Sequence, residues 1–312
     1  MRRRTLLQTA LCGPWLIGAA RAAPVERLSI IGSDTLAPLC LAWLARLQAD
    51  LPRLQVRFQA SGSSTAAQAL IEGAADFGPM SRRLTREETQ AFIERHGHAP
   101  RAIVVALDAI AVVVHPDNPL RQLSLHSLDG IYSSTRWCAP APALRRWGQL
   151  GLGGDWRRAE IVSYGRNTTS GTFEQFRQQA LCAGDFRPQV QQLLASAAVV
   201  RAVSTQRRAI GYSGAGHTDD SVRTLPLTLP DGVAVAPTAD AVVSERYPLS
   251  RPLLIYTLGG PDEPLRPAAA AFLQLVLSAS GQALAPAAGL IPLPLERLAQ
   301  QRLALGLDGP GI

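Results

Sequence analysis

The stretch "AIVVALDAIAVVVHP" (Ala102–Pro116) is long, rich in β-branched residues and largely apolar at odd and even positions alike. A strand with one solvated face alternates apolar and polar residues, whereas a strand covered on both faces is apolar on both. A second long apolar stretch, "YPLSRPLLIYTL" (Tyr247–Leu258), lies far downstream. Two such strands on either side of the middle of the chain predict two lobes joined by two chain crossings.

Short strand-like runs alternate with apolar residues at helical spacing through most of the chain. Before Ala102 we expect strands at 28–31, at 54–58 and from 75 onward, and helices at 36–51, 65–73 and 85–97. After Pro116 we expect helices at 123–132, 172–181 and 267–281, and strands at 159–164 and 209–214. This alternation predicts an α/β fold in which each lobe is a mostly parallel sheet flanked by helices.

The N-terminus, "MRRRTLLQTALCGPWLIGAARA", has a basic start, an apolar stretch and a small-x-small triplet that ends at Ala22. That pattern predicts a signal peptide cleaved after Ala22 and a periplasmic location. The segment Arg3–Gln8 resembles a twin-arginine signal, although leucine stands where phenylalanine is usual, so the export route stays open. We therefore expect a signal at 1–22, one lobe from 23–110 and 252–312, and a second lobe from 111–251.

The basic residues number 31, all of them arginine, and the formal charge of the 312-residue chain is +7. Removal of residues 1–22 takes away four arginines and no acid, which leaves +3. Since no later arginine run exceeds a pair, we expect no nucleic-acid partner. No apolar segment of membrane-spanning length follows the signal, which predicts a soluble exported protein, expected to be a monomer.

Three cysteines follow the predicted cleavage site. Cys40 lies in an apolar helical run and is expected to be a buried, inert thiol. Cys138 and Cys182 both fall in the predicted second lobe, and whether they pair stays open. Because no cysteine or histidine spacing is typical of a metal site, we expect neither a metal ion nor a cofactor.

Hydroxyl side chains mark three junctions at which a predicted strand gives way to a helix. They are "GSDT" (32–35), "SGSST" (61–65) and "SGT" (170–172), with helices expected to begin at Leu36, Ala66 and Phe173. Helix N-termini carry unpaired N–H groups and positive potential, which favour anions. Each junction alone is typical of an ordinary helix cap. Three of them, with Arg166 just before the last, predict an oxyanion site at the carboxyl ends of the strands.

Five motifs then give a specific resemblance. They are "IGSDTLAPL" (31–39), "ASGSSTAAQALIEGAADFGPMSR" (60–82), "GRNTTSGTFEQF" (165–176), "RAIGYSGAG" (208–216) and "YPLSRPLLIY" (247–256). In this order they resemble the periplasmic phosphate-binding proteins that serve ABC transporters. The resemblance implies a two-lobed, type 2 periplasmic-binding fold closing on phosphate. Carried over by position, it implies phosphate ligands at Thr35, Leu36 (through its N–H), Ser63, Ser81, Arg166, Ser170, Gly171 and Thr172.

Two departures from that family bear on selectivity. Many members have aspartate where Ser81 and Thr168 stand, the first to accept the proton of phosphate and the second to pair with the arginine. A serine hydroxyl both donates and accepts, so phosphate against sulfate selectivity is left open. Asp34 is the nearest acid in sequence; we expect it to cap a helix, with acceptance of the phosphate proton as the alternative.

The sequence also bears on two other function classes, a phosphatase and a binding module with other partners. A phosphatase needs a nucleophile or metal ions, but "GSST" around Ser63 is no nucleophile elbow and "HGH" (96–98) is typical of a solvated loop pair, so we expect no enzyme. A binding module of the same fold that senses phosphate or holds another oxyanion would differ only in its partners. Inorganic phosphate and an inner-membrane ABC permease are the partners that the resemblance implies.

Overall fold

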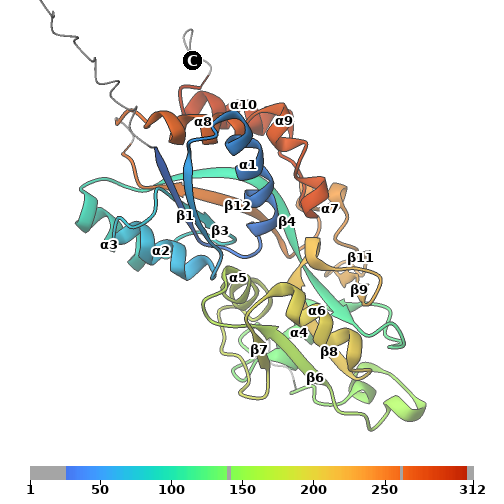
Figure 1. Cartoon of the computed structure of the whole chain (residues 1–312). Helices are drawn as coiled ribbons and strands as arrows, with labels where there is room; N and C mark the ends of the chain where they lie inside the picture. Colours follow the sequence, from blue (N-terminus) through green and yellow to red (C-terminus); the bar gives the residue numbers. More distant parts are fainter. Residues whose placement is uncertain (1–25, 139–141, 261–262, 308–312) are drawn as a thin grey trace, which may run out of the picture.

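The computed structural model describes residues 26–138, 142–260 and 263–307, so the signal predicted at 1–22 lies outside the described residues. The described chain forms two lobes on one curled sheet (Figure 1). Its strand order is β2-β1-β3-β12-β4-β8-β6-β7, and β9 also pairs with β4. The α/β class with two lobes is confirmed.

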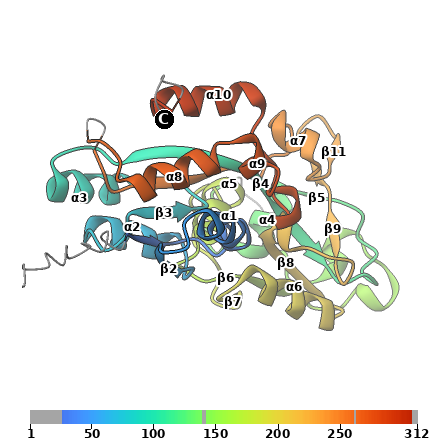
Figure 2. The same cartoon turned by 45° about the horizontal axis from the view of Figure 1, so that its top comes forward.

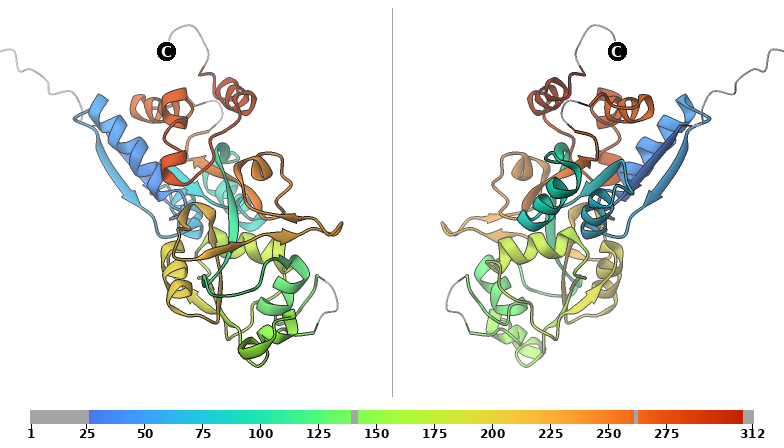
Figure 3. Two further views of the ribbon diagram at one scale, coloured as in Figure 1. Left: turned by 90° about the vertical axis from the view of Figure 1, so that its right-hand side faces the viewer. Right: turned by 90° about the vertical axis from the view of Figure 1, so that its left-hand side faces the viewer.

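The first lobe is built from both ends of the described chain. Its early elements are β1 (Arg27–Ile31), α1 (Ala37–Asp50), β2 (Gln55–Gln59), α2 (Ser63–Ile71), β3 (Phe77–Met80) and α3 (Arg86–His96). Its late elements are β12 (Ser250–Thr257), α8 (Pro267–Val276), α9 (Ala279–Gln282) and α10 (Leu295–Ala304). Of the late helices, α8 packs against α1 and β1, and all three lie on the side of the molecule away from the middle of the chain (Figure 3). Trp43 on α1 makes an edge contact with Phe272 on α8, at 6.3 Å between ring centroids, which joins the two sets.

The second lobe comes from the middle of the chain. It contains β5 (Leu123–Ser124), α4 (Leu125–Tyr132), β6 (Val162–Arg166), α5 (Gly171–Ala180), β7 (Gln191–Leu193), α6 (Ser196–Thr205) and β8 (Ala209–Gly214). The short elements β9 (Arg223–Leu225), β10 (Leu227–Thr228), β11 (Ala234–Val235) and α7 (Ala239–Val243) lead back to β12. In Figure 2, α6 lies beside β8, and it packs on that strand.

The strand β4 (Arg101–Val114) runs through both lobes. Residues 101–109 pair antiparallel with β12, and residues 110–114 pair antiparallel with β8. The backbone N–H of Ile110 donates to the carbonyl of Leu249, just before β12, where the chain returns. β4 is buried from Val105 to Val114, which is why its sequence is apolar on both faces. The antiparallel pairings of the main sheet involve β4 and β12, while β1, β2, β3 and β6, β7, β8 pair in parallel among themselves.

Several predicted boundaries are wrong by a few residues. The helices expected at Ala66 and Phe173 begin at Ser63 and Gly171, because their hydroxyl residues lie inside the first turn. The single helix expected at 267–281 is two helices: α8 begins with a proline and has no side-chain cap, and Ser278 caps α9 by accepting from the N–H of Gly281. The Thr85 and Glu88 side chains form a capping box at the start of α3. The elements β7, α6, α7 and α10 were not predicted from the sequence.

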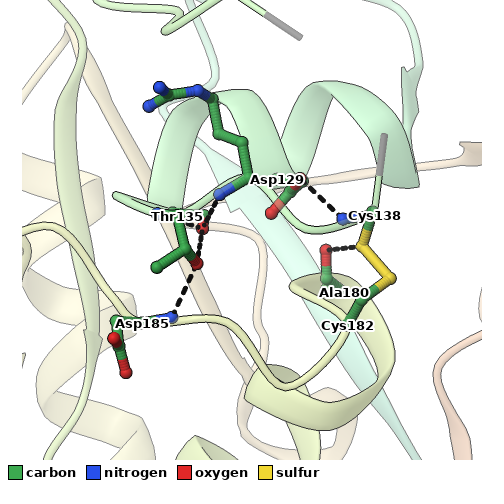
Figure 4. Close-up of a disulfide and its surroundings, with 8 residues drawn as sticks. Asp129, Thr135, Cys138, Ala180, Cys182 and Asp185 are labelled. Carbon is green, nitrogen blue, oxygen red and sulfur yellow. Dashed lines mark hydrogen bonds between the residues drawn. A yellow bond between two sulfur atoms is a disulfide. The ribbon is translucent and has the colours of Figure 1, made fainter. Parts of the chain in front are cut away.

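The cysteine question is answered by the structure. Cys138 and Cys182 form a disulfide that ties the segment after α4 to the end of α5 (Figure 4). Cys40 is free and buried, and burial raises the pKa of its thiol to about 12, so the thiol is inert. In the described ranges no single helix meets the length and hydropathy expected of a membrane span, and α8 with Ala279–Ala288 does so only as a pair bent by 62°.

Candidate functional site

The first junction lies between β1 and α1. Thr35 is 1 % exposed, and Leu36 stands at the N-cap position of α1 with no side-chain capping bond. The expectation that Asp34 caps this helix is therefore wrong. The hydroxyl of Ser33 instead accepts from the N–H of Thr35 at 3.2 Å, which fixes the turn. The Thr35 hydroxyl makes no hydrogen bond within this turn, so it is available for a contact with another element.

The second junction lies between β2 and α2, and there the start of α2 contacts the end of β3. Ser63 opens α2, Ser81 directly follows β3, and both side chains are fully buried. The hydroxyl of Ser63 accepts from the backbone N–H of Ser81 at 3.0 Å, and the two hydroxyl oxygens lie 3.3 Å apart. The hydroxyls of Ser63 and Ser81, which are 18 residues apart in sequence, therefore lie side by side in the protein interior.

The third junction belongs to the other lobe, where β6 ends at Arg166 and α5 begins at Gly171. Ser170 caps α5, its hydroxyl accepting from the N–H of Thr172 at 3.1 Å. Phe176 on α5 stacks on Tyr212 of β8 with ring centroids 3.9 Å apart. That stack packs the middle of α5 against β8.

The two lobes meet at these junctions. Thr35 Oγ1 lies 3.3 Å from Thr172 Oγ1, and the N–H of Ser64 donates to the carbonyl of Thr169 at 3.1 Å. A Cβ on Gly171 would lie 2.3 Å from Ser63 Oγ and 2.5 Å from the hydroxyl of Ser81, distances that real Cβ atoms do not adopt. Glycine is required there because α5 approaches α2 and β3 so closely. The structure brings six of the eight predicted residues to this one interface: Thr35, Ser63, Ser81, Arg166, Gly171 and Thr172; Leu36 directly follows Thr35, and Ser170 directly precedes Gly171.

Three of these hydroxyls are oriented as donors. Ser63 and Ser170 each accept a hydrogen bond from a backbone N–H, and Thr172 accepts one from a guanidinium. An N–H group can only donate, so the hydrogen of each hydroxyl points elsewhere. Buried donors gathered beside the start of α5 suit an acceptor-only ligand such as an oxyanion.

Arg166 is 1 % exposed and links the two lobes. Its Nη1 donates to Ser196 Oγ at 2.8 Å, and its Nη2 donates to the carbonyl of Leu194 at 2.7 Å and to Asp34 Oδ1 at 3.0 Å. Where the family resemblance places an acid at position 168 to pair with the arginine, this chain has Thr168 and supplies the acid from the first lobe. The ion pair of Asp34 and Arg166 is a contact that the sequence did not predict.

A second buried ion pair was missed in the sequence. Arg251 of β12 and Asp108 of β4 are register partners, and Arg251 Nη2 donates to Asp108 Oδ2 at 2.6 Å. Arg251 Nη1 donates to Thr172 Oγ1 at 3.0 Å and to the carbonyl of Ser81 at 3.3 Å. The signal that could have revealed this pair is one acid and one base, each inside a long apolar strand.

One histidine near the interface, His217, adds little positive charge. Burial lowers the pKa of His217, and the carboxylates of Asp108 and Asp34 oppose that shift, so His217 is mainly neutral at pH 7. The histidines of the "HGH" segment lie elsewhere; His96 Nε2 is 3.0 Å from the carbonyl of Leu70, so this side chain is not simply solvated as expected. In the part of the chain that the structure describes, no group of three or more His, Cys, Asp or Glu residues is placed to hold a metal ion.

Comparison with known proteins identifies the family. Residues 18–280 match the PBP superfamily domain. The phosphate-binding protein PstS of Pseudomonas aeruginosa is 44 % identical over 281 residues, which are 90 % of this chain and 87 % of that protein. The chain belongs to the PstS family. A Staphylococcus epidermidis PstS is 25 % identical over 258 residues, covering 81 % of this chain and 74 % of that protein.

Solved structures of similar proteins share the PstS fold. A Clostridium perfringens structure, assigned as a phosphate ABC transporter substrate-binding protein and solved with bound phosphate, is 27 % identical, with a TM-score of 0.72. It covers 86 % of this chain and 100 % of its own. A Vibrio cholerae ABC-type phosphate transport receptor, 24 % identical with a TM-score of 0.68 and the same two coverages, shows the same fold.

Proposed function

We propose that this chain is an exported binding protein that captures inorganic phosphate between its lobes and delivers it to an inner-membrane ABC permease. The observation that carries the proposal is the meeting of three hydroxyl-rich helix starts, from both lobes, beside Arg166 and Gly171. The membership of the PstS family and the phosphate named for its relatives support it. A tetrahedral oxyanion accepts hydrogen bonds on all sides, which matches donors that come from opposite lobes.

Each predicted residue has a role in this proposal. Hydroxyls and backbone N–H groups donate to phosphate from the first lobe (Thr35, Leu36, Ser63 and Ser81) and from the second lobe (Ser170, Gly171 and Thr172). Arg166 supplies the positive charge, with a planar fork that fits an oxyanion. Phosphate then competes with the carboxylate of Asp34, which occupies Arg166 Nη2 in this structure.

Capture requires the lobes to separate and close. We propose that residues 23–110 and 252–312 move as one lobe against residues 111–251, about β4 and the chain segment that enters β12. The ligand donors come from both sides of this hinge, so closure completes the site. We further propose that the protein is monomeric and periplasmic, released from its signal near Ala22.

Catalysis has no place in the proposal. The relatives are named as binding proteins, and among the described residues none of the site hydroxyls is hydrogen-bonded to a histidine or carboxylate that could act as a general base. A related binding function, capture of another oxyanion or phosphate sensing without uptake, is kept because Ser81 stands where many relatives of the resembled family carry an acid.

Calorimetry of the protein from Ala23 onward, with phosphate, sulfate and arsenate, tests the proposal. We expect one phosphate per chain, competition by sulfate, and no release of phosphate from a generic ester. Tighter binding of sulfate than of phosphate would favour the alternative oxyanion. Ester turnover abolished by a single substitution would contradict the assignment as a binding protein.

A further inference from the structure

We propose that Arg251, held by Asp108, is a positioning residue of the anion site: it fixes the Thr172 hydroxyl as a donor to the ligand. This inference rests on the proposed function, because it concerns the same site. Arg251 lies on the hinge strand β12, outside all three hydroxyl-rich junctions. Its side chain nevertheless contacts residues of both lobes, Ser81 from the first and Thr172 from the second.

The geometry of the ion pair points toward the site. Arg251 Nε and Nη2 both donate to the same oxygen, Asp108 Oδ2, at 3.0 and 2.6 Å. The other oxygen, Asp108 Oδ1, is buried and has no hydrogen-bond partner among the described residues. Arginine–carboxylate pairs are frequently bidentate, with one N–H on each carboxylate oxygen. Here the guanidinium leaves Nη1 directed at Thr172, at the expense of a fully bonded carboxylate.

The contact with Thr172 has a defined chemical result. Arginine carries no acceptor, so Arg251 Nη1 donates and Thr172 Oγ1 accepts at 3.0 Å. The Thr172 hydrogen must then point away from Arg251, where it is available to a bound anion; Thr35 Oγ1 lies 3.3 Å away, and in that contact either hydroxyl can donate. Hydrogen bonds to a charged donor also polarise the hydroxyl and strengthen the bond that it donates.

The arrangement around Arg251 leaves little freedom. A Cβ on Gly214, at the end of β8, would lie 3.3 Å from Asp108 Oδ2, 3.4 Å from the Thr35 methyl group and 3.5 Å from Arg251 Nη2. The guanidinium is therefore confined between β4, β8 and the Thr35 turn. Because Arg251 is 2 % exposed and its partner Asp108 is 1 % exposed, water does not compete for these bonds.

A double-mutant cycle tests the inference. The neutral pair Asp108→Asn with Arg251→Gln keeps polar side chains at both positions and leaves no unpaired charge. We expect this pair to weaken phosphate binding by about tenfold or more. In a Thr172→Val background the same pair should change the affinity less than twofold, because the hydroxyl that Arg251 positions is gone. In a Ser170→Ala background the full loss should remain, since no bond joins Arg251 to Ser170.

The matched control is the exposed pair Arg46 and Asp50, changed to Gln and Asn, which should leave phosphate affinity unaltered. If the variant with the buried neutral pair fails to fold, Arg251→Lys serves instead. The lysine charge still faces Asp108, but one ammonium cannot reach Asp108, Ser81 and Thr172 together. The lysine variant should therefore also lose affinity in the unchanged background and lose little in the Thr172→Val background. Equal losses in the Thr172→Val and Ser170→Ala backgrounds would overturn the inference. Absence of phosphate binding by the unchanged protein would instead overturn the proposed function.

Discussion

The two buried ion pairs at the centre of the molecule differ in what they join. Asp34 and Arg166 connect the two lobes, and the Asp34 side chain is 17 % exposed. Asp108 and Arg251 connect two neighbouring strands, with both side chains 1 % exposed. The first pair can separate when the lobes open, whereas the second can separate only if β4 and β12 come apart. In the closure that we propose, Arg166 therefore takes part in the movement, while Arg251 belongs to the hinge.

The largest expected effect is on the hinge pair. Asp108→Ala alone leaves the guanidinium of Arg251 buried without its carboxylate, which should lower the free energy of unfolding by about 3–5 kcal/mol. Urea unfolding followed by circular dichroism measures it. The neutral double change of both residues should recover most of the loss. Equal stabilities of the single variant and the unchanged protein would show that the pair is not a structural element.

Arg166→Ala should affect binding rather than folding. Removal of the buried cation that faces the anion should cost about 2–5 kcal/mol of binding free energy. Arg166→Lys should recover only part of it, because an ammonium replaces a planar fork. Phosphate calorimetry gives both values. An unchanged phosphate affinity in the alanine variant would show that Arg166 does not contact the ligand. The two arginines would then not differ in the way described.

Gly171→Ala tests whether the close contact of the lobes is needed. The added methyl group meets Ser63 Oγ and Ser81 Oγ, and such overpacking costs about 1–3 kcal/mol, which should raise the phosphate Kd by about tenfold. The free energy of unfolding should fall by less than the binding free energy, because separation of the lobes relieves the overlap and alanine is the better helix former. Gly153→Ala, where the new methyl group meets nothing within 4 Å, is the matched control. Equal affinities of the two variants would argue against closure of the lobes on the ligand.

The smallest effect is expected for Asp34→Asn. The variant removes the carboxylate that competes with phosphate for Arg166, so phosphate affinity should change by less than about tenfold. Competition calorimetry with phosphate and sulfate then tests whether Asp34 also accepts the phosphate proton. A larger share of bound sulfate would identify Asp34 as the acceptor of the phosphate proton. An unchanged ratio would leave Ser81 as the position that sets selectivity, and Ser81→Asp should then sharpen it.

The sequence predicted the parts of the site that depend on local chemistry. Hydroxyl residues at the starts of α1, α2 and α5 are recognisable because capping and anion binding use the same short pattern. The two long strands were recognisable from burial on both faces. The resemblance to a known family gave the order of the motifs and the residue roles, which composition alone does not contain.

What the sequence did not predict depends on contacts between distant residues. Asp34 was expected at a helix cap, but its partner Arg166 is 132 residues away and on the other lobe. Arg251 and Asp108 become partners only through the antiparallel register of β12 and β4, which no local pattern specifies. The helix starts at Ser63 and Gly171 differ from the expected ones because residues of the hydroxyl-rich junctions already lie inside the first turn.

A crystal structure of the protein from Ala23 onward with bound phosphate tests the central claim most directly. The account predicts one phosphate between the lobes, within hydrogen-bond distance of Thr35, Ser63, Arg166, Ser170 and Thr172, with Arg251 still bonded to Asp108 and Thr172. Phosphate bound at a different surface, or held by one lobe alone while these hydroxyls contact only each other, would contradict it.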